Sequence, residues 1–121
     1  MNWHFQDGSP IYTQLIGQIR QGIVSGAFRP GERLPSVRDL AMAAGVNPNT
    51  MQRALSELEQ EGLLESRATT GRFVTNDSAI LEKIKEAAVD AVIRASAKQY
   101  RELGLSMEQA AAMLLALDKE A

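Results

Sequence analysis

The feature that most constrains the fold is a pair of short helical segments separated by a glycine-containing turn. Ser36 is expected to cap the first segment, with Asp39 three residues later as a variant of the capping box, and Gly45 ends it. Asn47 is expected to cap the second segment, which has Pro48 in its first turn. Two short helices joined by a short turn that contains glycine are typical of a helix-turn-helix.

The segments around this pair extend the arrangement. Residues 63–67 and 71–75 are β-type sequences joined by a glycine-bearing turn, which predicts a hairpin. Upstream, Ser9 is expected to cap a helix that has Pro10 at its first position and ends at Gly26. The short segment 33–35 is expected to be extended, because its proline disfavours helix in the preceding residue. The order predicts a mainly α fold with a small β-wing, a winged helix-turn-helix.

A polar Asn-Asp-Ser stretch after the hairpin marks the expected domain boundary, which separates residues 1–77 from residues 78–121. The first part contains the whole winged helix, so a fragment that ends at residue 77 is expected to stay folded. The second part is expected to form a helix over residues 79–103 and a shorter helix capped by Ser106 and Gln109.

Composition excludes several functions. The chain has no cysteine, which excludes disulfides, thiol catalysis and thiolate metal sites. His4 is the only histidine and is expected to be a surface or packing residue beside Trp3 and Phe5. We therefore expect no catalytic residue, no metal and no cofactor. The chain also lacks a signal peptide and an apolar run of membrane-helix length, so a cytoplasmic protein without membrane contact is expected.

The helix that Asn47 begins has one apolar and one polar face. Met51, Leu55 and Leu58 fall on one side of a helical wheel and are expected to face the core. The outward side of the first two turns carries amide, hydroxyl and guanidinium groups, from Asn49, Thr50, Gln52 and Arg53. Asn and Gln can bind adenine bidentately and Arg can bind guanine, while a helix start can hold a phosphate. An ordinary exposed helix that happens to be polar is the alternative.

The C-terminal helices have more apolar surface than a simple hairpin of two helices needs. One stripe of the first helix contains Ile80 and Ile84, and a second lies nearly opposite. A second apolar face suggests a partner chain. The residues expected to form this dimerisation segment are Val89, Ile93, Tyr100, Met113 and Leu117. A self-contained helical hairpin is the alternative.

Four segments carry a resemblance to a known family: PGERLPSVRDLA, VNPNT, ALSELEQEGLLESR and TGRFV. Through them, residues 10–74 strongly resemble the DNA-binding domain of the GntR family of bacterial transcription regulators, and the two-helix tail resembles its YtrA-type branch. The resemblance implies a homodimeric regulator that binds double-stranded DNA at a palindromic operator, with repression as the expected mode. It also suggests control of neighbouring transporter genes. It identifies no small-molecule effector, and two helices are not expected to enclose a metabolite pocket within one chain.

The resemblance also implies roles for individual residues. Arg38 should hold a backbone phosphate. The major groove should be faced by Asn49, Thr50, Gln52 and Arg53, with Arg53 as the leading base-contacting residue. The wing should approach the minor groove or its phosphates through Arg67, Gly71 and Arg72.

One departure from the family pattern limits what can be transferred. Many members carry Arg where this chain has Pro48-Asn49 and Gln52, so their base preferences are not carried over. Three alternatives also stay open. Arg38 could pair with Asp39 or with an acid of the third helix, and the wing arginines could merely solvate the hairpin. The net charge of −2 motivates a winged helix used as a protein-interaction module.

Overall fold

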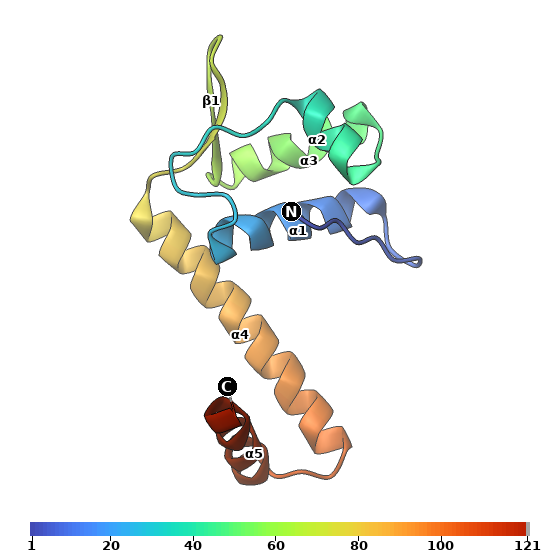
Figure 1. Ribbon diagram of the computed structural model, residues 1–121, viewed down its shortest axis with the longest axis vertical. Coiled ribbons are helices and arrows are strands. Elements are labelled where there is room, and N and C mark those ends of the chain that lie inside the picture. Colours follow the sequence, from blue (N-terminus) through green and yellow to red (C-terminus); the bar gives the residue numbers. More distant parts are fainter. Residues whose placement is uncertain (121) are drawn as a thin grey trace. The chain divides into compact units, whose positions relative to one another are not determined.

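The computed structural model describes residues 1–120 and contains five helices and one small sheet within that range (Figure 1). The elements are α1 (Ile11–Ser25), α2 (Val37–Ala44), α3 (Pro48–Gln60), β1 (Leu64–Arg67), β2 (Gly71–Val74), α4 (Ser78–Glu102) and α5 (Met107–Glu120). The chain divides into two compact units, Met1–Ile84 and a second that begins at Lys85. The mainly helical fold with a β-wing is therefore confirmed.

The first unit has a core made where α1 and α2 pack against α3. Leu15 and Ile19 of α1 and Met51, Leu55 and Leu58 of α3 are at most 1% exposed. The helical periodicity of α3 thus predicted its buried face correctly. Because that face is fixed in the core, the opposite face of α3 must point outward.

Local capping defines the two helices of the helix-turn-helix. The Ser36 hydroxyl accepts a hydrogen bond from the Asp39 backbone N–H at 3.1 Å. Gly45 ends α2 with φ of +71°, a left-handed conformation that suits glycine. The Asn47 side chain then accepts from the Asn49 backbone N–H at 2.7 Å, and α3 begins. All three positions agree with the sequence prediction.

The start of α1 differs from the prediction. Pro10, rather than Ser9, occupies the N-cap position, and it makes no side-chain capping bond. Its ψ of 141° is extended, so helical geometry begins only at Ile11. The Gln14 side chain also donates to the Ser9 carbonyl at 3.0 Å, which ties the residue before the helix to its first turn.

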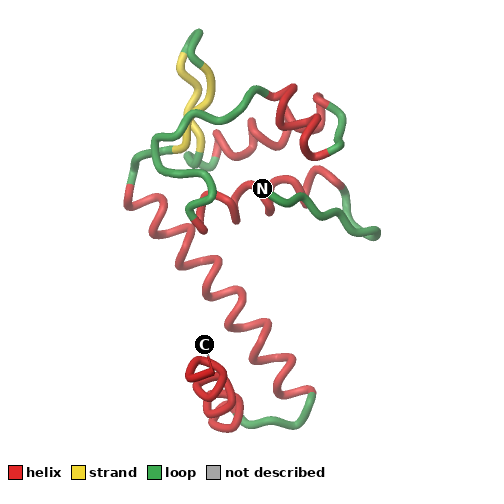
Figure 2. Tube along the Cα trace, viewed as in Figure 1, coloured by secondary structure: helices red, strands yellow, loops and turns green. Residues whose placement is uncertain are grey.

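The wing is a two-stranded antiparallel sheet, drawn in yellow in Figure 2. Ser66 of β1 lies directly opposite Arg72 of β2. The segment before α2 joins this sheet, because Arg33 forms an isolated bridge with Phe73 and the Leu34 N–H donates to the Arg72 carbonyl at 2.9 Å. The extended segment expected at residues 33–35 is thus anchored on the wing.

The beginning of α4 belongs to the winged-helix unit. Ile80, Leu81 and Ile84 are half-buried and pack against its core. The first compact unit runs to Ile84 and so includes the first turns of α4. The hairpin sequence and the polar stretch after it predicted the start of α4 correctly, but the first turns of this helix complete the core of the winged helix.

The second unit contains the rest of α4 together with α5. Ser106 and Gln109 form the predicted capping box: the Ser106 hydroxyl accepts from the Gln109 N–H at 3.1 Å, and the Gln109 side chain accepts from the Ser106 N–H at 2.9 Å. Ala110 is the one buried residue of α5 within the described range. Across residues 1–120, no helix has the length and apolar character needed to cross a membrane.

Candidate nucleic-acid interface

The outward face of α3 presents the polar side chains that the sequence singled out. Asn49, Gln52 and Arg53 are exposed, and Thr50 is half-buried. All four lie in the first turns of α3, whose opposite side is held in the core. The N-terminal turns of such a helix are the part that contacts base edges in helix-turn-helix proteins. The arrangement can therefore offer amide and guanidinium groups to a groove of DNA.

Arg53 is held by an aromatic ring of α1. Its guanidinium carbon lies 4.0 Å from the centroid of the Tyr12 ring. A cation over an aromatic face is attracted by the ring quadrupole, and the flat guanidinium stacks on it. Tyr12 therefore restricts the directions available to Arg53, the residue expected to contact a base.

Arg72 of the wing points toward α3. Its Nε donates to Glu59 Oε1 at 2.6 Å, and its Nη1 donates to Gln52 Oε1 at 3.3 Å. The Ser66 hydroxyl donates to the same oxygen of Glu59. The side chains of Arg72 and Glu59 are only 16% and 28% exposed. We call this group, Gln52, Glu59, Ser66 and Arg72, the wing-helix network.

The electrostatics of Glu59 follow from these partners. Burial raises the pKa of its carboxyl group, but the hydrogen bonds from Ser66 and Arg72 and the charge of Arg72 outweigh that effect. The pKa of Glu59 therefore lies below its ordinary value. The carboxylate stays charged and keeps Arg72 oriented toward α3.

The other predicted cationic residues differ in their surroundings. Arg38 is exposed and makes no ion pair with any of residues 1–120, so the pairing with Asp39 or with an acid of α3 is not observed. Arg67 lies over the Phe73 ring, 4.1 Å from its centroid, and pairs loosely with Glu65 at 3.8 Å. Arg38 thus remains available to a phosphate.

Gly71 opens the second strand of the wing in a conformation that suits glycine. Its φ is +110°, and a Cβ built there would lie 3.2 Å from Arg33 Nε. The exposed side chain of Arg33 therefore runs beside the wing at the position expected to approach DNA.

Two acids at the C-terminal end of α3, Glu59 and the C-cap residue Glu61, have positive partners. Glu61 pairs with Arg20 of α1, with 2.5 Å between Oε1 and Nη2, and Glu59 pairs with Arg72. These pairs place positive partners next to one acid of the last turns of the helix and next to its C-cap acid. The net charge of −2 is therefore a poor guide to the field at the start of α3.

Three residues of this surface were absent from the expected site: Tyr12, Arg33 and Glu59. The sequence gives no direct signal for Tyr12, an aromatic residue of α1, or for Glu59, one of several acids of α3. Arg33 lies in the extended segment before α2, and winged-helix topology places that segment beside the hairpin. For Arg33 a sequence signal therefore existed, whereas the contacts of Tyr12 and Glu59 join elements distant in the chain.

No group of three or more His, Cys, Asp or Glu within residues 1–120 could hold a metal ion. His4 is exposed, and its backbone, not its ring, is bound by the Gln18 side chain, through a 3.0 Å hydrogen bond to the His4 N–H.

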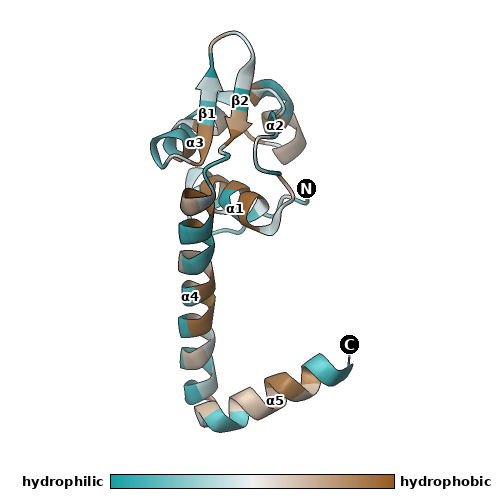
Figure 3. Ribbon diagram, turned by 90° about the vertical axis from the view of Figure 1, so that its left-hand side faces the viewer, coloured by the Kyte–Doolittle hydropathy of each residue, from teal (hydrophilic) through white to brown (hydrophobic). Residues whose placement is uncertain are grey.

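The second unit has a different surface, rich in apolar side chains. Figure 3 shows hydrophobic residues along α4 and α5. The exposed fraction of the five residues expected to dimerise is 48% for Val89, 60% for Ile93 and Met113 and 59% for Leu117, with Tyr100 half-buried. Much of this apolar area is thus accessible within one chain.

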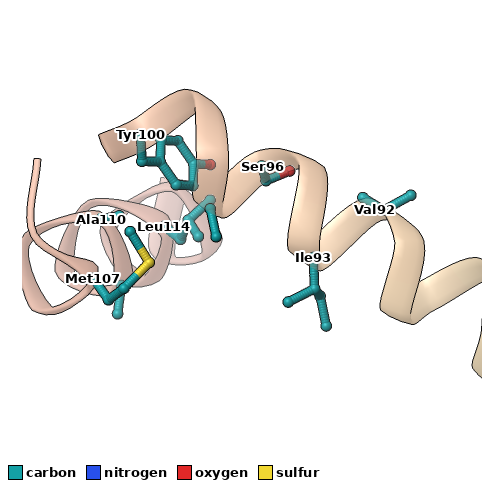
Figure 4. Close-up of a pocket in the computed structure, with 9 residues that line it drawn as sticks. Val92, Ile93, Ser96, Tyr100, Met107, Ala110 and Leu114 are labelled. Carbon is teal, nitrogen blue, oxygen red and sulfur yellow. The ribbon is translucent and has the colours of Figure 1, made fainter. Parts of the chain in front are cut away.

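A hollow of about 370 Å³ lies between α4 and α5 (Figure 4). Val92, Ile93 and Tyr100 line it from α4, and Met107 and Leu114 line it from α5. Val92 is 65% exposed and Ile93 60%, so the hollow is an open groove and not an enclosed pocket. Ile93 and Tyr100, which the sequence placed on a face for a partner chain, line this groove with α5 of the same chain.

Comparison with known sequences gives a consistent assignment. Residues 11–74 match the model of the family described as bacterial regulatory proteins, gntR family. The chain is 39% identical over 109 residues to the uncharacterized HTH-type transcriptional regulator YhcF of Bacillus subtilis, covering 90% of each chain. It is 34% identical over 96 residues to the HTH-type transcriptional repressor YtrA of the same organism, covering 71% of this chain and 74% of the relative.

Solved structures agree with the sequence relatives. A GntR family transcriptional regulator from Listeria monocytogenes superposes with a TM-score of 0.81 at 32% identity, covering 97% of this chain and 99% of the other. The DNA-binding domain of AraR, solved in complex with operator ORX1, superposes with a TM-score of 0.57 at 29% identity, covering 62% and 96%. The exposed start of α3, the wing beside it and these matches lead to one conclusion: the chain belongs to the GntR family of helix-turn-helix transcriptional regulators, which are not enzymes.

Proposed function

We propose that this protein is a homodimeric, cytoplasmic repressor that recognises a palindromic operator through the start of α3 and the wing. The proposal rests on the exposed polar side chains at the start of α3, with the wing-helix network beside them. Asn49, Gln52 and Arg53 would contact base edges, Thr50 and Arg38 would hold phosphates, and Arg67 with Gly71 would bring the wing to the minor groove. Repression would follow from occupation of promoter DNA.

The proposed residues have the chemistry that these tasks need. Amide side chains can bind adenine through two hydrogen bonds, and Arg can bind guanine in the same way. An exposed Arg without an ion pair, such as Arg38, can neutralise a phosphate and release counterions. The relatives add support, because the name of YtrA describes a repressor and AraR was crystallised on an operator.

The tail supports the dimeric part of the proposal. Burying exposed apolar side chains is favourable, and patches of this kind on a protein surface mark interaction sites. On α5, Leu114, Leu115 and Leu117 are each at least half exposed in the single chain. A second copy that packs α4 and α5 against the same helices would bury them and the walls of the open groove. Two linked heads would then meet two half-sites of an operator, about 34 Å or a multiple apart.

Selection of bound sequences from random duplex DNA, with the full-length protein at two salt concentrations, tests the proposal. We expect an inverted repeat to emerge, and binding to it to weaken steeply as salt rises. Enrichment of no sequence would contradict sequence-specific regulation. Binding that ignores salt would favour the alternative, a winged helix that contacts another protein.

A further inference from the structure

The wing-helix network connects the position of the wing to the orientation of Gln52, a side chain proposed to contact a base. Gln52, Ser56 and Glu59 follow one another along the side of α3 that faces the wing, at positions i, i+4 and i+7. Arg72 reaches both ends of this row, because its Nε donates to Glu59 and its Nη1 donates to Gln52. Arg72 lies on β2 directly opposite Ser66 of β1, and the Ser66 hydroxyl also donates to Glu59.

We propose that Glu59 is a positioning residue for DNA recognition, which acts through Arg72 to orient the side-chain amide of Gln52. The proposal rests on the proposed function, because it assigns the specificity of the same surface. Glu59 need not touch DNA. Its part is to hold the Arg72 guanidinium against α3, so that the second nitrogen of that group faces Gln52.

The orientation of Gln52 follows from what each partner can do. An amide can turn over and exchange its oxygen with its nitrogen, but a guanidinium can only donate. Arg72 therefore selects the carbonyl oxygen of Gln52 for the wing side, with 3.3 Å between Nη1 and Oε1. The amide nitrogen is left on the other side, where it donates to the Ser56 hydroxyl at 3.4 Å.

An amide oriented in this way still has a donor and an acceptor for a base. The carbonyl oxygen has a second lone pair, and the NH₂ group has a second hydrogen. Bidentate recognition of adenine needs this pair, with the oxygen accepting from N6 and the nitrogen donating to N7. A turned amide would present the two groups in the reverse order and lose the match. Glu59 thus sets which edge of the amide faces the base.

The test uses the full-length protein and compares base preference position by position. Gln52→Ala first identifies the base pair that Gln52 contacts, because the preference for one base at that position should fall by about 5- to 150-fold. Glu59→Gln, which keeps the shape of the side chain and removes its charge, should relax preference at the same base pair and change other positions less than about twofold. The double variant should lose no more preference there than Gln52→Ala alone.

Two variants separate orientation of Gln52 from anchoring of the wing. Ser66→Ala removes a donor to Glu59 but leaves the contact between Glu59 and Arg72, so it should preserve preference at that base pair. Glu57→Gln makes the same charge change on the same helix, at a residue without an ion pair to residues 1–120, and serves as the matched control. If Glu59→Gln does not fold, Arg72→Met carries the same expectation for base preference, but not for the salt slope.

Salt dependence adds a readout that a purely structural role would not produce. Glu59→Gln frees Arg72 to approach a phosphate, so the slope of log affinity against log salt should stay equal or steepen by up to about 0.9. A wing that simply detaches would lose phosphate contacts, so the slope would become shallower and all sequences would weaken together. That result would overturn the positioning role.

The remaining outcomes are equally decisive. The positioning role is overturned if Glu59→Gln leaves the Gln52-dependent preference intact, if Ser66→Ala relaxes it as much, or if Gln52→Ala changes no preference. Absence of any base preference in the unaltered protein would overturn the proposed function together with this inference, so the two failures are distinguishable.

Discussion

Two truncations of the tail test where the DNA-binding unit ends. One fragment stops after residue 77, where the hairpin has been completed, and the other stops after residue 84. Only the longer fragment keeps Ile80, Leu81 and Ile84, which pack against the winged-helix core. We therefore expect the fragment 1–84 to be clearly more stable than the fragment 1–77, although both contain every residue of the wing and of α3.

The size of the difference follows from the burial of these three side chains. Complete burial of one Leu or Ile contributes about 1.5–3 kcal/mol. Since all three are only half-buried, together they contribute about 2–4 kcal/mol. A small domain has a free energy of unfolding of about 5–15 kcal/mol, so the shorter fragment loses a large part of its stability.

Urea unfolding followed by circular dichroism measures the difference. With an m-value of about 1–2 kcal/mol/M, the midpoint of the fragment 1–77 should lie about 1–4 M below that of 1–84. In the full chain, Leu81→Ala should lower stability, whereas its exposed neighbour Glu82→Ala should change it by less than about 0.5 kcal/mol. Equal midpoints for the two fragments would refute the assignment of the first turns of α4 to this core.

The same fragment 1–84 tests the role of the tail. It lacks the second unit, so it should sediment as a monomer and bind a half-site weakly. Linking two heads through the tail raises the effective concentration of the second, which can strengthen binding by about 10²–10⁴. A fragment that stayed dimeric, or bound the palindrome as tightly as the full chain, would show that dimerisation does not depend on the tail.

Three further predictions concern single residues. Arg38→Ala should weaken binding to operator and random DNA alike and reduce the salt slope by about 1 in a titration across salt concentrations; loss confined to the operator would contradict a phosphate role. Arg53→Ala should cost about 1–3 kcal/mol and relax preference at one position per half-site, and equal loss on every sequence would refute base contact. The pKa of Glu59 is lowered in the folded state, so its ionisation stabilises the fold above the unfolded pKa of about 4.3, and that contribution is lost as pH falls through the folded value. The difference in urea midpoint between the unaltered protein and Glu59→Gln should therefore shrink below about pH 4.3, and a difference that stays constant from pH 7 to pH 3 would contradict this linkage.

The sequence by itself determined the features that depend on neighbours along the chain. Ser36, Gly45 and Asn47 mark helix ends through hydrogen bonds and backbone conformations within a few residues. Helical periodicity predicted which side of α3 is buried, and therefore that Asn49, Gln52 and Arg53 face outward, with only Thr50 half-buried. These signals are local, so no tertiary information was needed to interpret them.

Only the tertiary structure determines which of the polar side chains contact one another. Whether Arg72 turns toward DNA or toward α3 depends on Glu59, which is thirteen residues away in the chain. The stacking of Arg53 on Tyr12 joins α3 to α1, and the first turns of α4 complete a core made by earlier helices. Composition and periodicity carry no information about such pairs, because long charged side chains have several partners within reach and only packing selects among them.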